Sequence, residues 1–372
     1  MADAAERSEA GATGIGRTLL LLFLSGLAVV VLGCIALLLD SWIYTSRAES
    51  LHTQIKIGIS VDKALGLLGD KPEGNAKTHG GILMNHKNAL LQWSVFITKR
   101  PGLNRELPPG YESLAWVPNS STLIYGERDA VLVDTFLTAE ASQALADWVM
   151  ASGKNLTTIY LTHGHGDHFF GIGLLKQRFP HARAVARPDI VEAMRHELDP
   201  PYFNSFWNSR FPGQLPEQLA VPETLERNTI ELEGHELVLV DTGYTDTALS
   251  TSLHVPSIDL MVAGDVAYNG VHPYMAEGNP QTWPKWIAAL DKLESLKPRA
   301  VIAGHKRPEN DDHPRIIEET RSYFRDFLRL NEETTTVREL FDRMMKLHGD
   351  RANPGSLWGG ATAAKAPIAH NR

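Results

Sequence analysis

The densest group of chemically active side chains in this chain lies in the segment Thr162-His163-Gly164-His165-Gly166-Asp167-His168. Three imidazoles and one carboxylate fall within the six residues 163–168, and two glycines separate them. Neutral imidazole and carboxylate are ligands for divalent metals such as zinc. Four such groups at one place are out of keeping with a buried core or an ordinary polar turn. The segment therefore predicts a metal site.

Two further polar residues occupy matching places later in the chain. Asp265 follows the apolar run 260–263 and a glycine, and His305 follows the apolar run 301–303 and a glycine. An aspartate after a strand is more often a turn or helix cap. Beside a four-ligand cluster, however, two strand-end positions of the same kind strengthen each other. A two-metal site needs more than four ligands, so we predict both residues as additional ligands.

The elements that must position these residues alternate from residue 120 onward, with strand-like and helix-like periods in turn. Strands are expected at 122–125, 130–134, 158–161, 183–186, 230–232, 236–240, 252–255, 260–263 and 300–303, and helices at 139–150, 172–179, 189–197, 283–296, 315–330 and 337–347. Two strand-rich halves with helices outside them predict an α/β fold, a helix–sheet–sheet–helix sandwich with polar groups collected at strand ends. The segment 200–222, rich in proline and aromatic residues, is expected to be a long loop.

An uncharged apolar run covers residues 19–39, 21 residues in all. About 20 apolar residues cross the roughly 30 Å hydrocarbon core of a bilayer, and Trp42 and Tyr44 follow where interfacial aromatics are common. A signal peptide has a shorter apolar region, usually followed by small residues. We therefore expect a single-pass membrane protein, with the side of its catalytic domain undecided. A lipoprotein modified at Cys34 and a buried core helix are weaker alternatives.

These patterns divide the chain into five parts. They are an N-terminal tail (1–18), a transmembrane helix (19–39), a connector and lead-in that is partly helical near 83–96 (40–114), a catalytic domain with C-terminal helices (115–347), and a flexible tail (348–372). The formal net charge of −8 offers no basic patch, so nucleic acid is not expected as a partner. The single cysteine excludes an intrachain disulfide and a cysteine-based metal site.

The segment 162–168 resembles the H-x-H-x-D-H signature of the metallo-β-lactamase superfamily of hydrolases. Asp265 and His305, each after a glycine, are similar to the later metal motifs of that family, and Asp134 resembles its early strand-end aspartate. The resemblance covers residues 115–315 with the motifs in the family's order. It implies a four-layer αββα sandwich of the metallo-β-lactamase type.

The resemblance also implies roles for these residues. The implied centre holds two zinc ions through imidazole and carboxylate ligands: His163 and His165 for one ion, Asp167, His168 and His305 for the other, and Asp265 between them. Asp134 is expected to orient the cluster loop without binding metal.

One position departs from the family pattern, because Tyr244 stands where a third imidazole of the first metal is expected. A phenol has a pKa near 10 and is a poorer ligand than imidazole. Three outcomes are open: Tyr244 binds as phenolate, the first site holds metal weakly through its remaining ligands and water, or His272 or His254 substitutes. The number of metal ions, one or two, is therefore open, and so is zinc against iron or manganese.

The function implied is hydrolysis of an ester, thioester, lactone or amide by a hydroxide held between two metals about 3.5–4 Å apart. Asp167 and Asp265 are expected to act in the catalytic centre, and Tyr268, His272 and Tyr274 are candidate contacts to the oxyanion or leaving group. The expected substrate is a small molecule. The aromatic segment 200–222 and the membrane anchor favour a lipophilic one.

Two other functions compete with this hypothesis. A degenerate, membrane-tethered member would keep the fold with weak or no catalysis, as the tyrosine at position 244 suggests. An iron-dependent thiol oxygenase or a glyoxalase-like thioester hydrolase of the same superfamily would use similar ligands. Bound metal and turnover separate these alternatives.

Overall fold

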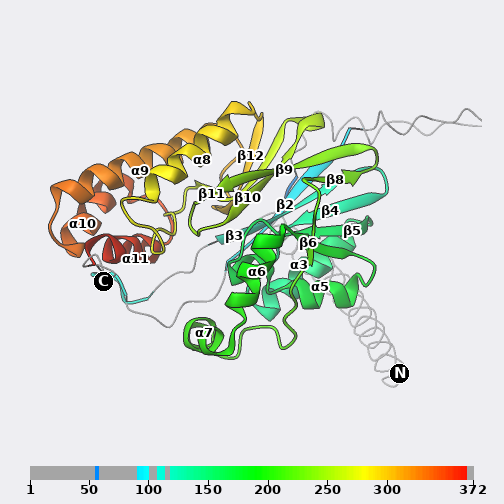
Figure 1. Ribbon diagram of the computed structural model, residues 1–372, viewed down its shortest axis with the longest axis horizontal. Helices are drawn as coiled ribbons and strands as arrows, with labels where there is room; N and C mark the ends of the chain where they lie inside the picture. Colours follow the sequence, from blue (N-terminus) through cyan, green and yellow to red (C-terminus); the bar gives the residue numbers. More distant parts are fainter. Residues whose placement is uncertain (1–54, 58–89, 100–106, 114–117, 367–372) are drawn as a thin grey trace, which may run out of the picture. The chain divides into compact units, whose positions relative to one another are not determined.

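The computed structural model describes residues 55–57, 90–99, 107–113 and 118–366. In this part of the chain the strands form two mixed sheets (Figure 1). The seven-stranded sheet has the order β1 (Ile55–Ile57), β2 (Gln92–Lys99), β3 (Pro118–Tyr125), β4 (Asp129–Val133), β5 (Asn155–Tyr160), β6 (Arg183–Ala186) and β7 (Glu223–Thr224). Strands β1 to β4 pair antiparallel, and β4 to β7 pair parallel.

The second sheet has five strands in the order β12 (Ala300–Lys306), β11 (Leu260–Asn269), β10 (Ser250–Val255), β9 (His235–Gly243) and β8 (Thr229–Leu232). Its strands pair antiparallel, except for the parallel pair β11–β12. The two sheets meet along β3 and β12, where the Ser120 hydroxyl donates to the Ala303 carbonyl. This contact brings the start of β3 beside the strand that carries His305.

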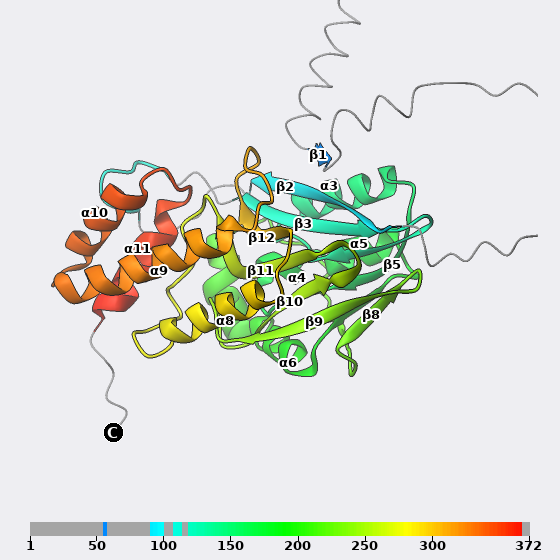
Figure 2. The ribbon, with the colours of Figure 1, turned by 90° about the horizontal axis from the view of Figure 1, so that it is seen from above.

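Helices flank the two sheets. Those near the first sheet are α3 (Ala139–Ala151), α4 (Gly166–Phe169), α5 (Ile172–Arg178), α6 (Pro188–Glu197) and α7 (Pro200–Phe203), which continues as the π-helix η2 (Asn204–Asn208). Those after β10 are the 3-10 turn η3 (Pro256–Ile258), α8 (Trp283–Ser295), α9 (Arg315–Glu333), α10 (Val337–His348) and α11 (Pro354–Lys365). Figures 1 and 2 show α8 and α9 lying along β11.

Three hydrophobic cores show the layering. In β4, Leu132 packs into the core with α3, α5 and α6, whereas its neighbours Val131 and Val133 pack into the core between the two sheets. In β11, Val262 faces the core between the sheets and Ala263 faces the core with α8, α9 and α10. Because successive strand residues point to opposite faces, each sheet is covered on both sides. The arrangement is helix, sheet, sheet, helix, as the sequence pattern predicted.

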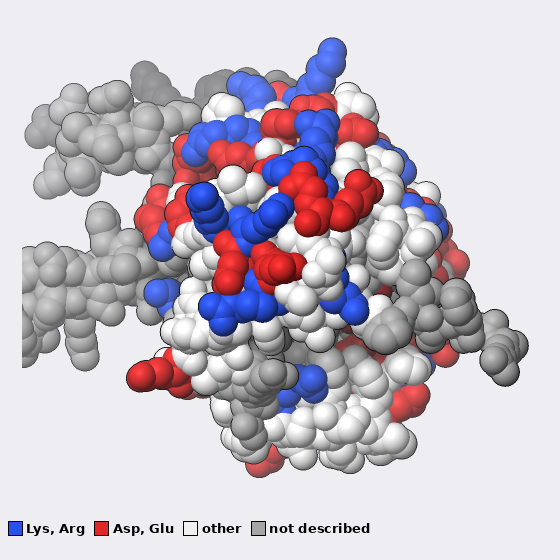
Figure 3. All heavy atoms as spheres, turned by 90° about the vertical axis from the view of Figure 1, so that its left-hand side faces the viewer, with Lys and Arg blue, Asp and Glu red and all other residues white. Residues whose placement is uncertain are grey.

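The outer helices carry charges of both signs. Figure 3 shows blue and red side chains side by side on the face that lies at the left of Figure 1. On α9, Arg321 pairs with Glu318 and Glu294, and Arg329 pairs with Asp326. A solvent-exposed pair such as Arg329–Asp326 stabilises a fold by less than about 1 kcal/mol, whereas the Arg321 side chain is buried and its carboxylate partners are exposed. Helix α10 begins with a capping box, in which Thr336 and Glu339 satisfy each other's backbone N–H groups.

The structure corrects the prediction that 40–114 is only a connector with a partly helical stretch near 83–96. Residues 92–99 form strand β2, which pairs with β3 along its whole length. Val95, Phe96 and Ile97 are all buried, because both faces of the strand are covered. Val95 and Ile97 pack into the core between the sheets, and Phe96 packs into the core with α3, α5 and α6. A strand buried on both faces lacks the alternation that marks a strand in a sequence.

The C-terminal segment also differs from its prediction as a flexible tail. Pro354 opens helix α11, and Leu357 and Ala361 are buried against the core of α8 to α10. The helix is rich in glycine and alanine, so its sequence shows little contrast between an apolar and a polar face. One side is nevertheless buried, because the helix packs against α10. The predicted membrane anchor at 19–39 lies outside the described residues. Among those residues, no helix combines the length and apolar character that crossing a membrane requires.

Candidate metal centre

Five segments converge at one edge of the sandwich. The loop after β5 carries His163 and His165 and leads into α4, which carries Asp167 and His168. The remaining segments are β9 with the turn after it, β11 and β12. Apart from helix α4, these segments are ends or interruptions of strands, where polar groups can leave the sheet without losing backbone hydrogen bonds.

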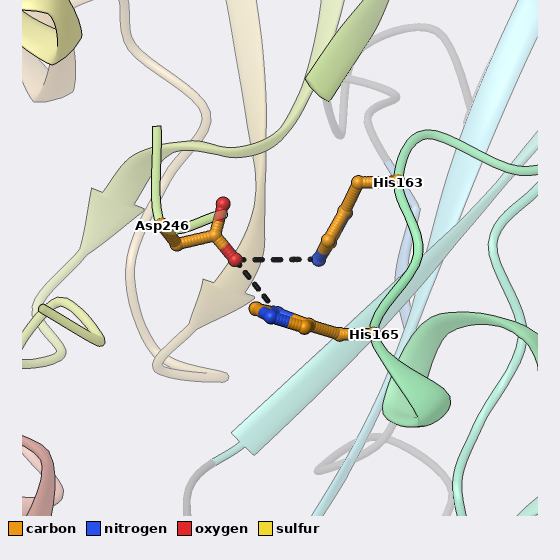
Figure 4. Close-up of side chains that lie close together, drawn as sticks. All are labelled: His163, His165 and Asp246. Carbon is orange, nitrogen blue, oxygen red and sulfur yellow. Dashed lines mark ion pairs between the residues drawn. The ribbon is translucent and has the colours of Figure 1, made fainter. Parts of the chain in front are cut away.

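The first group of donors is His163, His165 and Asp246 (Figure 4). Oδ2 of Asp246 lies 3.4 Å from Nε2 of His163 and 2.8 Å from Nδ1 of His165. All three residues are buried. Asp246 is held by the Thr245 hydroxyl, which donates to its Oδ1 at 2.7 Å. The other carboxylate oxygen is left to face the two imidazoles.

The second group of donors is Asp167, His168 and His305, with Asp265 beside them. Oδ2 of Asp167 lies 3.8 Å from Nε2 of His168 and 3.6 Å from Nε2 of His305. Asp265 places Oδ1 3.3 Å from His168 Nε2 and Oδ2 2.9 Å from His305 Nε2. Because Asp265 also groups with His163, it lies between the two sets of donors.

The geometry of these donors fits a metal centre. Atoms bound to one tetrahedral ion at about 2.0–2.1 Å lie roughly 3.3 Å apart, and most of the separations above are close to that value. His163 Nε2, His168 Nε2, Asp246 Oδ2 and Asp265 Oδ1 are buried without a hydrogen bond. Leaving a buried polar atom unsatisfied costs about 1–3 kcal/mol, so four of them facing one another point to a ligand that satisfies them together.

The outer nitrogens of the imidazoles are held by neighbouring groups. Asp134 Oδ2 lies 3.0 Å from His168 Nδ1, and the same carboxylate accepts from the backbone N–H and the hydroxyl of Thr162. His305 Nδ1 lies 3.1 Å from the Pro118 carbonyl, and His165 Nε2 lies 3.0 Å from Glu277 Oε1. Such contacts fix the tautomer and the ring orientation of a metal ligand. Asp134 lies behind the cluster loop, where the resemblance placed it.

Glycines allow the close approach of β11 and β12. Gly264 has a φ of 56°, in the left-handed region that favours glycine, and the β11–β12 register shifts on either side of it. This irregularity turns Asp265 out of the ladder. At Gly304, a Cβ atom would overlap Asp265 Oδ1 and lie 3.0 Å from Cε1 of His168. A side chain at either glycine would therefore collide with a neighbouring residue, which explains why glycine precedes each candidate ligand.

Without metal, the buried charges hold one another. Burial alone would raise the pKa of Asp265, but His305 and His168 hold it well below its usual value. Burial would likewise lower the pKa of His168, yet Asp265 and Asp167 raise it well above normal. For His165, Glu277 and Asp246 overcome burial and raise the pKa in the same way. Bound metal ions would replace the protons that these imidazoles hold.

Tyr268 belongs to the site. Its hydroxyl donates to Asp265 Oδ2 at 2.7 Å, and its ring stacks on His305 with centroids 5.4 Å apart. Burial and the Asp265 carboxylate raise its pKa well above the usual value, so the phenol keeps its proton. Tyr274 lies at the rim, with its ring edge-on to His165 at 5.7 Å.

Tyr244 and the proposed substitute histidines belong to none of the donor groups, which hold only histidine and carboxylate residues of the described chain, and their polar atoms or backbones have other partners. The Tyr244 hydroxyl donates to the backbone carbonyl of Glu277 at 2.7 Å, so the proton that a phenolate ligand would have to lose is engaged in a hydrogen bond. His272 Nδ1 lies 3.1 Å from the Tyr323 hydroxyl of α9, and burial lowers its pKa to about 3. His254 pairs with Val238 and Met261 within the sheet. The prediction of His272 as a catalytic or ligand residue is therefore corrected.

Asp246 is the residue that sequence reasoning missed. It stands two residues after Tyr244, in a run of threonines and aspartates after β9. The sequence offered one clue to this ligand: an aspartate lies two residues from the position where the family has an imidazole. Only the direction of its side chain, set by the turn in which Thr245 N–H donates to the Thr247 carbonyl, identifies it.

The segment 200–222 packs beside the cluster. Trp207 and Phe211 are buried, and Trp207 lies edge-on to Phe170, just after α4, at 5.3 Å. The indole N–H of Trp207 donates to Glu197 at 2.6 Å. The segment therefore supports α4 as part of the core, with some of its aromatic side chains partly exposed.

Comparison with known proteins agrees with this geometry. The model of the metallo-beta-lactamase superfamily matches residues 114–305, so the chain belongs to that superfamily. Its members are generally hydrolases that bind metal ions. A metallo-beta-lactamase family protein from Thermus thermophilus has the same fold, at 20% identity and a TM-score of 0.51, over 72% of this chain and 91% of that protein.

Two other comparisons are more distant or shorter. A metallo-beta-lactamase from Pontibacter korlensis is 16% identical, with a TM-score of 0.47, over 63% of this chain and 94% of that one. The uncharacterized protein YobT of Bacillus subtilis (strain 168) is 35% identical over 71 residues, which are 19% of this chain and 30% of that protein. The matched part thus spans less than a third of that relative.

Proposed function

We propose that this chain is a metal-dependent hydrolase with two metal ions, acting on an ester, thioester, lactone or amide of a small molecule. The observation that carries the proposal is the pair of buried donor groups, each with two imidazoles and one terminal carboxylate, on either side of Asp265. Two divalent ions held there would supply an activated water at neutral pH and polarise the scissile carbonyl.

The chain's own residues position this chemistry. Asp265 directs Oδ1 at His168 and Oδ2 at His305, it also groups with His163 of the first set, and Tyr268 fixes its orientation by donating to Oδ2. Asp167 faces His168 and His305 while the Asn119 amide donates to its Oδ2 at 3.2 Å. The Tyr268 hydroxyl, protonated and next to the centre, is a candidate donor to an oxyanion or leaving group.

The completed first donor group argues against the degenerate alternative. The expectation of a weakened site rested on the tyrosine at position 244, whereas Asp246 supplies the third donor from two residues further on. A chain that kept the fold without metal would retain several buried charges and unsatisfied atoms at a cost in stability.

Metal content and turnover test this function. The full chain is purified, loaded with zinc, manganese or iron(II), and analysed for bound metal. Esters, thioesters and lactones of increasing chain length are then assayed with and without a chelator. We expect two ions per chain and hydrolysis that the chelator abolishes. Less than one ion per chain under every loading condition would overturn the proposal.

A matched pair of variants separates the site from the fold. Asp167→Asn removes a charged donor and should lower both metal content and turnover. Asp342→Asn alters an exposed carboxylate that pairs with Arg338 on helix α10, and it should leave both unchanged.

We also propose that residues 19–39 anchor the enzyme in a membrane and that its substrates are lipophilic. The support is the uncharged apolar run and the aromatic segment beside the site. Fractionation of cells that express the full chain, or a chain lacking 19–39, tests the anchor. Release of the shortened chain from the membrane fraction is expected, and equal partition of both chains would contradict it.

A further inference from the structure

The two donor groups of the centre have the same composition. One consists of His163, His165 and Asp246, and the other of His168, His305 and Asp167, with Asp265 between them. The family pattern expects three imidazoles at the first position. A carboxylate there adds a hard, anionic oxygen donor and removes a nitrogen donor, which changes the kind of ion that the position favours.

We propose that Asp246 makes this centre a site for oxygen-preferring first-row divalent ions, manganese or iron(II), which compete with zinc far better than they would at a three-imidazole position. The inference rests on the proposed function and specifies its metal. Two imidazoles and one carboxylate with open positions are the donor set of many non-haem iron(II) sites, and carboxylates favour manganese, whereas imidazole-rich tetrahedral sites favour zinc.

The surroundings of Asp246 hold its carboxylate in the orientation of a metal ligand. Its side chain has no exposed surface, and its Oδ1 accepts from the Thr245 hydroxyl, while Oδ2 is buried without a hydrogen bond. Figure 4 shows Oδ2 directed at the ring nitrogens of His163 and His165. A carboxylate that served only the turn would not direct one buried oxygen at the ring nitrogens of two imidazoles.

The surroundings of the first group reinforce its anionic character. His165 lies between two carboxylates, with Nδ1 at 2.8 Å from Asp246 and Nε2 at 3.0 Å from Glu277. A carboxylate on the outer nitrogen makes an imidazole a more basic ligand. With Asp167 and Asp265, the centre has three carboxylate donors where the family pattern expects two. The negative charge of this third carboxylate stabilises hard cations, which bind well to oxygen ligands and do not require nitrogen ligands.

The test compares relative affinities in the full chain and in variants. Zinc and manganese dissociation constants are measured by competition with a chelating indicator, and bound manganese is followed by electron paramagnetic resonance, which reports on coupled pairs of ions. In Asp246→His, the ratio of the manganese to the zinc dissociation constant should rise by roughly tenfold or more, because a third imidazole favours zinc. Asp246→Asn should retain one ion and lose the coupled signal. Asp342→Asn, on helix α10, should match the wild type in every measurement.

Each outcome decides the inference. An unchanged ratio in Asp246→His, or two tightly held ions in Asp246→Asn, overturns it while leaving the hydrolase function standing. A wild-type chain that binds no ion overturns the proposed function itself. If Asp246→His does not fold, as judged by circular dichroism, Asp246→Glu serves in its place. That variant keeps the carboxylate, so it should keep the wild-type ratio, and a ratio shifted toward zinc would contradict the inference.

Discussion

At the scale of single residues, the centre depends on the direction of a few side chains. Tyr244 and Asp246 are separated by one residue, yet the first donates to the Glu277 carbonyl and the second faces two imidazoles. The turn after β9 therefore assigns the third donor to a carboxylate. The tyrosine instead ties this turn to the segment that carries Glu277.

The first prediction concerns Tyr244→His. If Tyr244 left the first position short of a ligand, this change would raise the metal content toward two ions per chain. Because Asp246 already fills the third position, we now expect elemental analysis to find two ions in both the wild type and the variant. A rise from one ion to two in Tyr244→His would contradict the assignment of Asp246.

The second prediction concerns Tyr268→Phe, which removes the hydroxyl that donates to Asp265. Loss of such an outer contact costs about 10- to 100-fold in activity or metal affinity. We expect kcat to fall by about that factor, with two ions retained at saturating metal. Tyr125→Phe is the control, since Tyr125 lies at the end of β3 beside Lys154. An unchanged kcat in Tyr268→Phe would show that the Tyr268 hydroxyl has no role in catalysis.

At the scale of elements, the site is made by strands that can approach closely where glycine replaces a side chain. Strands β11 and β12 pair parallel, and the register shift around Gly264 directs Asp265 toward His168 and His305. The predicted strands 260–263 and 300–303 begin where β11 and β12 begin, but β11 continues to Asn269 and β12 to Lys306, so both candidate ligands lie within the strands. The sequence pattern did not reveal the irregularity itself, because a bulge depends on the pairing partner.

The third prediction follows from that close approach. In Gly304→Ala, the new methyl group would overlap Asp265 Oδ1 and crowd His168. We expect metal affinity to fall by roughly 10- to 100-fold through displacement of a ligand, measured by competition with a chelating indicator. The control is Gly359→Ala in α11, where a Cβ would meet Ala276 at an ordinary 3.7 Å. That change should leave affinity unaltered and raise stability by about 0.4–1 kcal/mol. Equal affinities in both variants would refute the steric argument.

At the scale of the whole molecule, the C-terminal helices are joined to the sheet that carries Asp265 by a buried polar contact. His272 follows β11, lies 3.1 Å from the Tyr323 hydroxyl of α9 and makes a backbone bond in which its own N–H donates to the Ala352 carbonyl. Burial, followed by the charges of Arg351 and His348, lowers the pKa of His272 to about 3. The folded protein therefore contains it as the neutral imidazole.

The fourth prediction is the pH dependence that this produces. A histidine has a pKa near 6.5 when unfolded, so below that pH the unfolded chain binds a proton that the folded chain does not bind. The stability that His272 contributes is complete above about pH 6.5 and falls as the pH drops toward 3. The loss is about 2 kcal/mol at about pH 5.

Denaturant unfolding at several pH values tests this effect. His272→Asn should flatten the decline of the unfolding free energy between about pH 7 and pH 5 by roughly that amount. His181→Asn, at an exposed position, is the control and should follow the wild type. A variant of His272 with the same acid sensitivity as the wild type would show that another group is responsible.

The sequence by itself determined the local features of this protein. Spacing and residue type in 162–168 predicted a metal site, and glycine-flanked strand ends predicted Asp265 and His305, because ligand chemistry and strand periodicity are written in neighbouring residues. The tertiary structure decided what depends on distant segments. Strand β2 and helix α11 are recognised only by the cores that bury them. Asp246 is recognised as a donor only because folding brings the turn after β9 to the loop after β5, and a ligand set is a property of directions in space.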